Sequence, residues 1–240
     1  MTTDSSVEGA AKRPELIASP WHTAVVMMIG ALNAYRGAIY AAQARSGPRT
    51  SRGSMYVRTM AFECFFLAVV ALGVWLRGKS LQSIFGQRWR TLRELFRDAG
   101  LGVALWFVAL IAVSILSGLG GHQQASDPTI HFLLPQSPAE MSLWVVLSLV
   151  AGIGEEAIFR GYLQRQFMGF CQSVPAGIVL SAAAFGAAHL YQGWSRAVMI
   201  AASAVLFGVV AQWRGTVRPG MFAHAFQDAI APLLIKLMHH

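Results

Sequence analysis

Two neighbouring glutamates and an arginine interrupt one of the most hydrophobic stretches of this chain. Glu155 and Glu156 follow the apolar run 149–154, and Arg160 comes one helical turn later. Charged side chains at bilayer depth are costly, so such residues are functional-site candidates by default. Two adjacent carboxylates are harder still to hold there, because each disfavours ionisation of the other. Their presence indicates acid–base chemistry, in which a carboxylate takes a proton from a reacting group.

The spacing of these three residues gives the two glutamates different roles. Glu156 and Arg160 are four residues apart with the acid first, which is the favourable order for an ion pair on one helix face. Glu155 points about 100° away from Glu156 and has no such partner. We therefore expect Glu156 to be a structural anchor and Glu155 to be free to act as a general base.

Two further pairs with helical spacing occur downstream, again within apolar segments. Phe185 precedes His189 by four residues, and His224 precedes Asp228 by four, so each pair lies on one helix face. Imidazole and carboxylate groups are the usual acid–base partners in catalysis. Each pair alone is also compatible with ordinary packing, and its value as a signal comes from the combination with the glutamates.

A helical hairpin brings the first two of these groups to one depth. The turn centres near Gln172; Glu155 lies seventeen residues before it and His189 seventeen after it. Small residues permit close approach of the second helix, and they are Ala182, Ala183, Ala184, Gly186, Ala187 and Ala188. A simple up-and-down arrangement does not place His224 and Asp228 at the same level, so helix tilt or an irregular connection is required.

Composition predicts a membrane protein. Of 240 residues, 55% are hydrophobic and only 12% are charged, whereas a soluble domain is about a quarter charged. The apolar residues form blocks of about 20, which is the length that crosses a bilayer as a helix, and no alternating β-barrel segments occur. The net charge of +8 does not indicate nucleic-acid binding, because the arginines lie between apolar blocks and not in a recognition module.

The predicted fold is all-α: a polytopic transmembrane bundle of about seven spans plus one amphipathic interfacial helix. Residues 1–20 are expected to be a disordered cytosolic tail, 21–117 to hold the N-terminal membrane helices, and 140–237 to form a catalytic membrane core. The spans are predicted near 21–43, 57–76, 99–117, 141–170, 176–190, 196–213 and 221–237. Lys and Arg are more numerous on the side that carries the N-terminus, which predicts that this side faces the cytosol.

Two features of the N-terminal half lead to further expectations. Apolar residues at helical spacing alternate with arginines over 80–98, which predicts an amphipathic helix on the membrane surface. Arg36 and Glu63 lie at similar distances from the centre of the first loop, so they either form a buried ion pair or Arg36 extends to the interface.

The three motifs together resemble those of the CAAX-protease and bacteriocin-processing family of intramembrane endopeptidases. Glu155, Glu156 and Arg160 are similar to its EExxxR motif, Phe185 and His189 to its FxxxH motif, and His224 with Asp228 to its HxxxN motif. The motifs occur in the family's order and within hydrophobic helices, over about 140–237. The third motif differs, since Asp228 stands where the family usually has asparagine.

The resemblance implies a multi-pass protein of a bacterial inner (plasma) membrane that hydrolyses a peptide bond in a membrane-associated or lipidated peptide or protein. Glu155 would activate water, His189 would help to bind and orient it, and His224 would stabilise the oxyanion. Glu156, Arg160 and Phe185 would support these groups. An ionised aspartate cannot donate a hydrogen bond to an oxyanion, so we favour an orienting role for Asp228 over a protonated or cation-binding one.

The resemblance leaves the cofactor and the class of function open. We expect no cofactor; the alternative is zinc held by Glu155, His189 and His224. The expected partners are the peptide substrate and the lipid bilayer, and no nucleic acid. Two other functions are possible for such a cavity, namely a non-catalytic peptide-binding or bacteriocin-immunity protein, and a proton- or cation-coupled transporter. The transporter would require inverted repeats and broken helices, which the sequence does not indicate.

Overall fold

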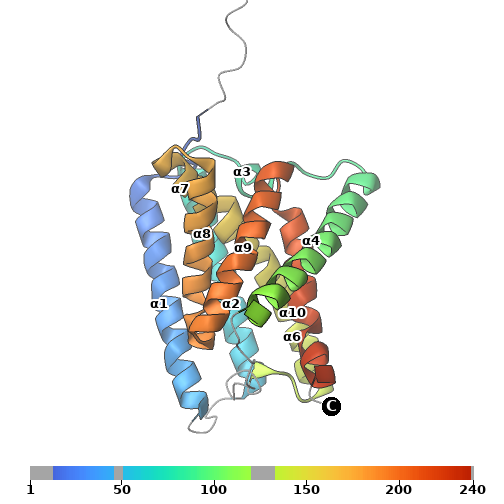
Figure 1. Cartoon of the computed structure of the whole chain (residues 1–240). Helices are drawn as coiled ribbons and strands as arrows, with labels where there is room; N and C mark the ends of the chain where they lie inside the picture. The colour runs from blue at the N-terminus through green and yellow to red at the C-terminus, as the bar shows by residue number, and fades with distance from the viewer. Residues whose placement is uncertain (1–12, 46–50, 120–132, 239–240) are drawn as a thin grey trace, which may run out of the picture.

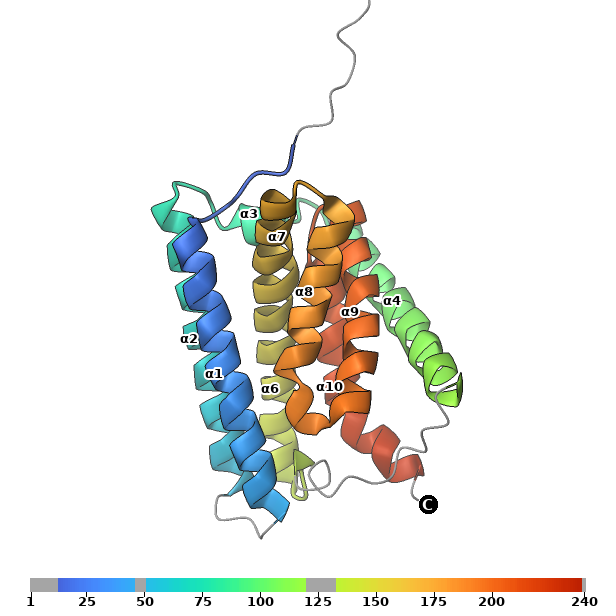
Figure 2. The same cartoon turned by 60° about the vertical axis from the view of Figure 1, so that its left-hand side comes forward.

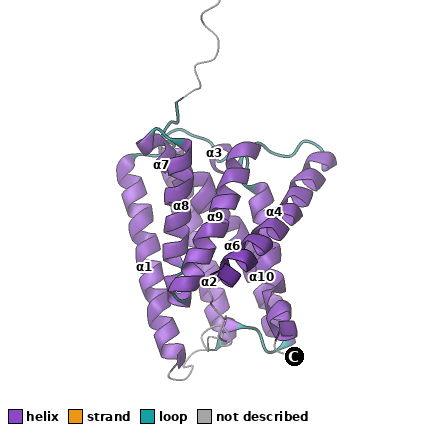
Figure 3. Ribbon diagram, in the orientation of Figure 1, coloured by secondary structure: helices purple, strands orange, loops and turns teal. Residues whose placement is uncertain are grey.

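Long helices run between the two ends of a bundle and account for most of the described chain (Figures 1 and 3). The computed structural model describes residues 13–45, 51–119 and 133–238, and no strand occurs among them. The helices are α1 Pro20–Arg45, α2 Arg52–Leu76, α3 Gln82–Phe85, α4 Leu92–Leu119, α6 Pro138–Glu156, α7 Gln164–Cys171, α8 Val174–Ala188, α9 Trp194–Arg214 and α10 Arg218–Met238. The all-α prediction is confirmed for these residues.

Five helices of the described chain are long and apolar enough to cross a membrane. They are α1, α2, α4, the continuous helix Pro138–Cys171 and α9. α8 is apolar but has only 15 residues, and α10 carries His224, Asp228 and an internal Pro232. The chain is therefore a multi-pass membrane protein, while the predicted number of seven spans is not confirmed.

Local sequence signals explain where these helices begin and end. Ser137 and Ser173 cap α6 and α8 by accepting a hydrogen bond from a backbone N–H in the first turn, and a proline follows each of them. Gln172, at φ 51°, occupies the left-handed conformation that ends α7. The turn therefore centres on the residue that the sequence predicted.

The helix that carries the glutamates contains a π-helical segment, Ala157–Leu163, directly after Glu156. The sequence predicted a helix that continues past Arg160 to about Phe170, and the structure confirms this, but it did not predict the wider turn. All seven residues of the segment are buried. The segment joins α6 to α7 and lies within the main apolar cluster. π-helical turns of this kind occur frequently at functional sites.

The predicted interfacial helix at 80–98 is wrong. Only the four residues of α3 are helical before α4 begins at Leu92. Gly86, at φ 82°, ends α3, and a side chain there would meet Thr216 Cβ at 2.5 Å. Trp89 then reaches the buried Asp98 through a hydrogen bond of 2.8 Å. The segment therefore packs against the α9–α10 connection instead of continuing as a helix. The helical spacing of its apolar residues does not reveal this contact.

Part of the predicted disordered tail is packed. Residues 1–12 lie outside the described chain, but Ile17 and Ala18 are buried against α7. The Gln166 side chain accepts hydrogen bonds from the N–H groups of both residues, at 2.8 and 3.2 Å, and donates one to the Ala18 carbonyl. A buried amide therefore satisfies this backbone segment.

The predicted ion pair between Arg36 and Glu63 does not form. Arg36 is exposed on α1, whereas Glu63 is only 6% exposed and faces the bundle interior. Placement of two residues at a similar depth does not determine how each helix is rotated about its own axis. The packing of α2 on α6 selects the rotation that turns Glu63 away from α1. Of the two readings, the exposed position of Arg36 fits the one in which this residue reaches the interface.

α8 and α9 form a hairpin that ends inside the bundle. In two views, their connection lies well short of the adjacent ends of α1 and α2 (Figures 1 and 2). The connection is a 3₁₀ turn, Leu190–Gln192, that follows His189 directly. The shortness of α8 therefore sets His189 at an inner level of the bundle, at a helix C-terminus.

Candidate active site

Glu156 and Arg160 form the predicted ion pair in the middle of the bundle. Arg160 Nη1 donates to Glu156 Oε1 at 2.8 Å, and the two side chains are 1% and 3% exposed. The guanidinium also lies over the rings of Phe185 and Phe207, at 4.3 and 5.3 Å from their centroids. These aromatic faces give further electrostatic stabilisation to a cation removed from water.

The same carboxylate orients His224. His224 Nδ1 lies 3.1 Å from Glu156 Oε1, and because a carboxylate only accepts, the ring donates from Nδ1. Nε2 then faces two other acids, at 3.8 Å from Glu155 Oε2 and 3.5 Å from Asp228 Oδ2. Glu156 thus holds the ring on its Nδ1 side, and Asp228, for which we expected an orienting role, lies on the Nε2 side.

Two glycines permit this meeting of α6 and α10. A side chain at Gly152 would meet the Ala225 backbone nitrogen at 2.7 Å, and one at Gly220 would meet Glu156 Oε2 at 2.6 Å. The two helices therefore approach closely enough for His224 to reach both glutamates. His224 and the two glutamates thus lie at one level, which a simple up-and-down arrangement did not predict. Glycines on facing helices were visible in the sequence, but their pairing was not.

His189 lies at the end of α8 with one ring nitrogen engaged. Nδ1 is 2.9 Å from the Phe185 carbonyl, which only accepts, so Nδ1 carries hydrogen and Nε2 is left as an acceptor. The Phe185 ring contacts both imidazoles, at 4.7 Å from His189 and 5.9 Å from His224 between centroids. Phe185 therefore forms the wall between the two histidines.

The structure adds two residues that the sequence analysis did not place in the site. Tyr191 stacks on His189 at 6.0 Å between ring centroids, and it interacts electrostatically with Glu155 and Asp228. Glu63 on α2 interacts electrostatically with Glu155 and with His224. The signal for Glu63 was present, because it is the only acidic residue of its span, but the sequence analysis considered it only as one possible partner of Arg36.

Three carboxylate oxygens at the site have no hydrogen-bond partner among the described residues. They are Oε2 of Glu63, of Glu155 and of Glu156, and each is buried. A buried polar atom of this kind calls for a specific explanation, such as a bound group or a reactive role. For Glu155 the observation agrees with a carboxylate that is held ready for a reacting group.

The residues considered for zinc are Glu155, His189 and His224. No group of three or more His, Cys, Asp and Glu side chains within the described ranges is arranged to hold a metal ion. His224 and His189 each have Nδ1 engaged with a protein acceptor, so Nε2 is the ring nitrogen that remains for a ligand. His224 Nε2 lies 3.8 Å from Glu155 Oε2.

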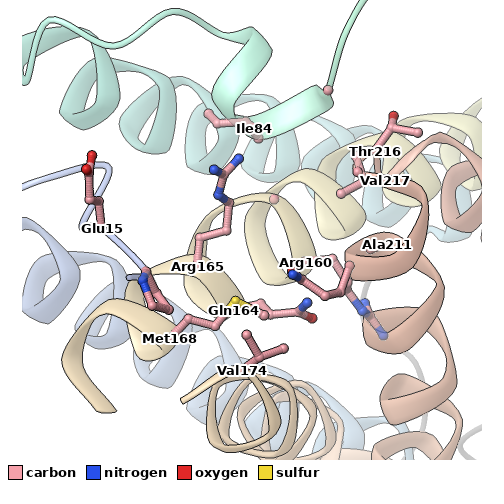
Figure 4. A pocket seen from close by; sticks show the side chains of 15 residues that line it. Glu15, Ile84, Arg160, Gln164, Arg165, Met168, Val174, Ala211, Thr216 and Val217 are labelled. Carbon is pink, nitrogen blue, oxygen red and sulfur yellow. The ribbon is translucent and has the colours of Figure 1, made fainter. Parts of the chain in front are cut away.

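A separate pocket of about 340 Å³ lies at the end of the bundle that carries the N-terminal segment (Figure 4). Its lining comes from the N-terminal segment, α3, the π-helical segment, α7, the start of α8, α9 and the α9–α10 connection, and it includes Arg160, Gln164 and Arg165. Glu155, His189, His224 and Asp228 are not among its lining residues. Arg160 therefore borders both this pocket and the buried ion pair, whereas the acid–histidine cluster lies outside the pocket lining.

Comparison with known proteins identifies the C-terminal part of the chain. A family model described as Type II CAAX prenyl endopeptidase Rce1-like matches residues 137–230. No curated protein and no solved structure matches the chain. The matched segment contains the helices that carry the glutamates, His189 and His224, so the three motifs and the fold around them agree with a protease family of the membrane. Residues 137–230 of this chain are therefore similar to the Type II CAAX prenyl endopeptidase family.

Proposed function

We propose that this protein is an intramembrane endopeptidase in which Glu155 activates water for hydrolysis of a peptide bond. One observation carries the proposal: of the two adjacent glutamates, Glu156 is paired through Oε1 with Arg160 and His224, whereas Glu155 Oε2 is buried without a hydrogen-bond partner among the described residues, 3.8 Å from His224 Nε2. A general base needs such an available acceptor close to the groups that stabilise the reaction.

The neighbouring residues support distinct steps. Glu155 takes the proton of the attacking water, and the Nε2 acceptor of His189 orients that water. The Glu156–Arg160 pair fixes the His224 ring, so that its Nε2, when protonated, donates to the oxyanion that forms on the scissile carbonyl. The proton taken by Glu155 then passes to the leaving amine, as microscopic reversibility requires of a single acid–base group.

Asp228 has a place in this scheme that does not require it to donate. Its carboxylate lies 3.5 Å from His224 Nε2. In the free enzyme it accepts a hydrogen bond from the Nε2–H, and in the reaction the oxyanion replaces it as the acceptor. Trp144 Nε1 donates to the Asp228 backbone carbonyl at 2.8 Å, which ties this turn of α10 to α6. The asparagine that is usual in the family would donate to the substrate directly.

The substrate is a membrane-associated or lipidated peptide, because the cluster lies between membrane helices and the matched family acts on CAAX prenyl proteins. The protein would reside in a bacterial inner membrane with its N-terminus in the cytosol. The end of the bundle with the 77–97 linker then faces the cytosol, in agreement with its arginines.

The test compares wild type with Glu155→Gln in membranes and with purified protein in liposomes. Peptide termini that appear only with wild type identify substrates, and synthetic peptides of those sequences then measure cleavage and binding separately. We expect Glu155→Gln to abolish cleavage and to retain peptide binding, because the amide keeps the shape of the carboxylate but not its basicity. Glu140→Gln, in the first turn of the same helix, is the matched control.

Two outcomes contradict the proposal. Cleavage that persists in Glu155→Gln at the wild-type rate shows that another group is the base. Peptide capture by wild type without any new termini, across the membrane proteome, supports a non-catalytic binding protein instead.

A further inference from the structure

Glu63 is a carboxyl group at the site that comes from outside the matched segment. It lies near the midpoint of α2, and Glu155 lies near the midpoint of the continuous helix Pro138–Cys171. The two helices pack along each other, and a side chain at Gly154 would stand 3.3 Å from Glu63 Oε2. The absence of a side chain at position 154 therefore lets Glu63 reach the face of α6 next to Glu155.

The charges around Glu63 make an ionised carboxylate there hard to balance. The acids of the cluster are Glu63, Glu155, Glu156 and Asp228, and the groups that can be cationic are Arg160, His189 and His224. Arg160 pairs with Glu156, and His224 lies between Glu156, Glu155 and Asp228.

On the neighbouring helix α1, Arg36 is exposed, and Tyr191 also interacts electrostatically with Glu63. A buried charge without a partner is costly, and protonation removes that cost.

We propose that Glu63 is a positioning residue for Glu155: it carries a proton and, as a neutral acid, donates a water-bridged hydrogen bond to the Glu155 carboxylate. The inference rests on the proposed function of Glu155 as the base. The bridge satisfies Oε2 of both residues, which have no hydrogen-bond partner in the described part of the protein. The bridge also fixes the Glu155 side chain. Because Glu63 is neutral, Glu155 is the only one of the two that is ionised between α2 and α6.

This arrangement makes opposite predictions for two substitutions of Glu63. Glutamine is neutral and can donate from its amide, so Glu63→Gln should retain most of the cleavage rate with an unchanged KM. Leucine has similar size but no donor, so Glu63→Leu should lower kcat by about 10²-fold, as expected for a displaced catalytic group. KM should change little, because Glu63 does not contact the substrate.

A second measurement tests the proton without any substrate. Infrared difference spectra of the purified protein, wild type against Glu63→Gln, should show the C=O stretch of a protonated carboxylic acid that is lost in the variant. Glu140→Gln, whose carboxylate is at the protein surface, should leave that band unchanged. Glu63→Met replaces the leucine variant if the latter does not fold.

The outcomes separate this inference from the proposed function. If wild type cleaves and Glu63→Leu cleaves equally well, or if Glu63→Gln is as impaired as Glu63→Leu, the positioning role is refuted while the protease function stands. Absence of the carboxylic-acid band refutes the proton on Glu63 regardless of activity. If wild type cleaves no membrane peptide, the proposed function fails, and the positioning role fails with it.

Discussion

Replacing Arg160 with methionine tests whether the buried ion pair holds the site together. Methionine retains the length and apolar character of the arginine stem, but it removes the charge that lies 2.8 Å from Glu156. Glu156 is 0% exposed and cannot turn to water in place of its partner. The variant therefore leaves an uncompensated carboxylate, or forces it to take up a proton.

The expected loss of stability is large for a single substitution. Removing one partner of a buried ion pair costs about 3–5 kcal/mol. The guanidinium also loses its contacts with the rings of Phe185 and Phe207, and a desolvated cation–π contact contributes up to about 2 kcal/mol. These terms overlap, so we expect a decrease in the free energy of unfolding of about 4 kcal/mol or more.

The double variant Arg160→Met with Glu156→Gln separates charge from packing. It removes both charges, so neither is left unpaired, and it should recover part of the stability lost in each single variant. We expect a coupling energy of about 2–3 kcal/mol between the two positions. Activity should not recover, because the glutamine no longer provides the carboxylate that fixes His224 through Nδ1.

The assay is equilibrium unfolding in mixed micelles by titration with sodium dodecyl sulfate, followed by tryptophan fluorescence and circular dichroism. Arg165→Met is the matched control, because Arg165 is on the same helix but exposed, and it should cost about 1 kcal/mol or less. The reasoning is refuted if Arg160→Met is as mild as this control, or if the effects of the two single substitutions simply add in the double variant.

Two further variants test contacts that the structure assigns. Gly220→Ala would place its methyl group 2.6 Å from Glu156 Oε2, so it should displace that carboxylate, lower the free energy of unfolding by about 1–3 kcal/mol and lower kcat. The control is Gly100→Ala, which has open space around it and should be neutral or stabilising. Equal effects of the two substitutions would contradict the close contact at Gly220. Asp98→Asn weakens the hydrogen bonds that Asp98 accepts from Trp89 and Arg214. It should lower the free energy of unfolding by about 1–3 kcal/mol, while kcat at low temperature stays at the wild-type value. A fall in kcat without a loss of stability would show that Asp98 and its two partners take part in the reaction.

Those parts of the fold that depend on short-range spacing could be predicted from the sequence. Apolar blocks of about 20 residues predicted most of the long helices, and Gln172 was correctly expected at the hairpin turn. The pair of Glu156 and Arg160 was likewise predictable, because residues four apart on one helix meet whatever surrounds them. The helix at 80–98 was mispredicted because a long-range contact overrides its periodic pattern. Gly86 packs against Thr216 and ends the helix after four residues.

The tertiary structure decided which side chains complete the site. Rotation of a helix about its own axis leaves its hydrophobicity pattern nearly unchanged in a bundle that is apolar on many faces, so sequence could not choose between Arg36 and Glu155 as the neighbour of Glu63. Nor could it choose the partner of His224, which lies 68 residues from Glu156 along the chain. Close contacts at Gly152, Gly154 and Gly220 fix these rotations, because each admits a neighbouring helix that a larger side chain would exclude.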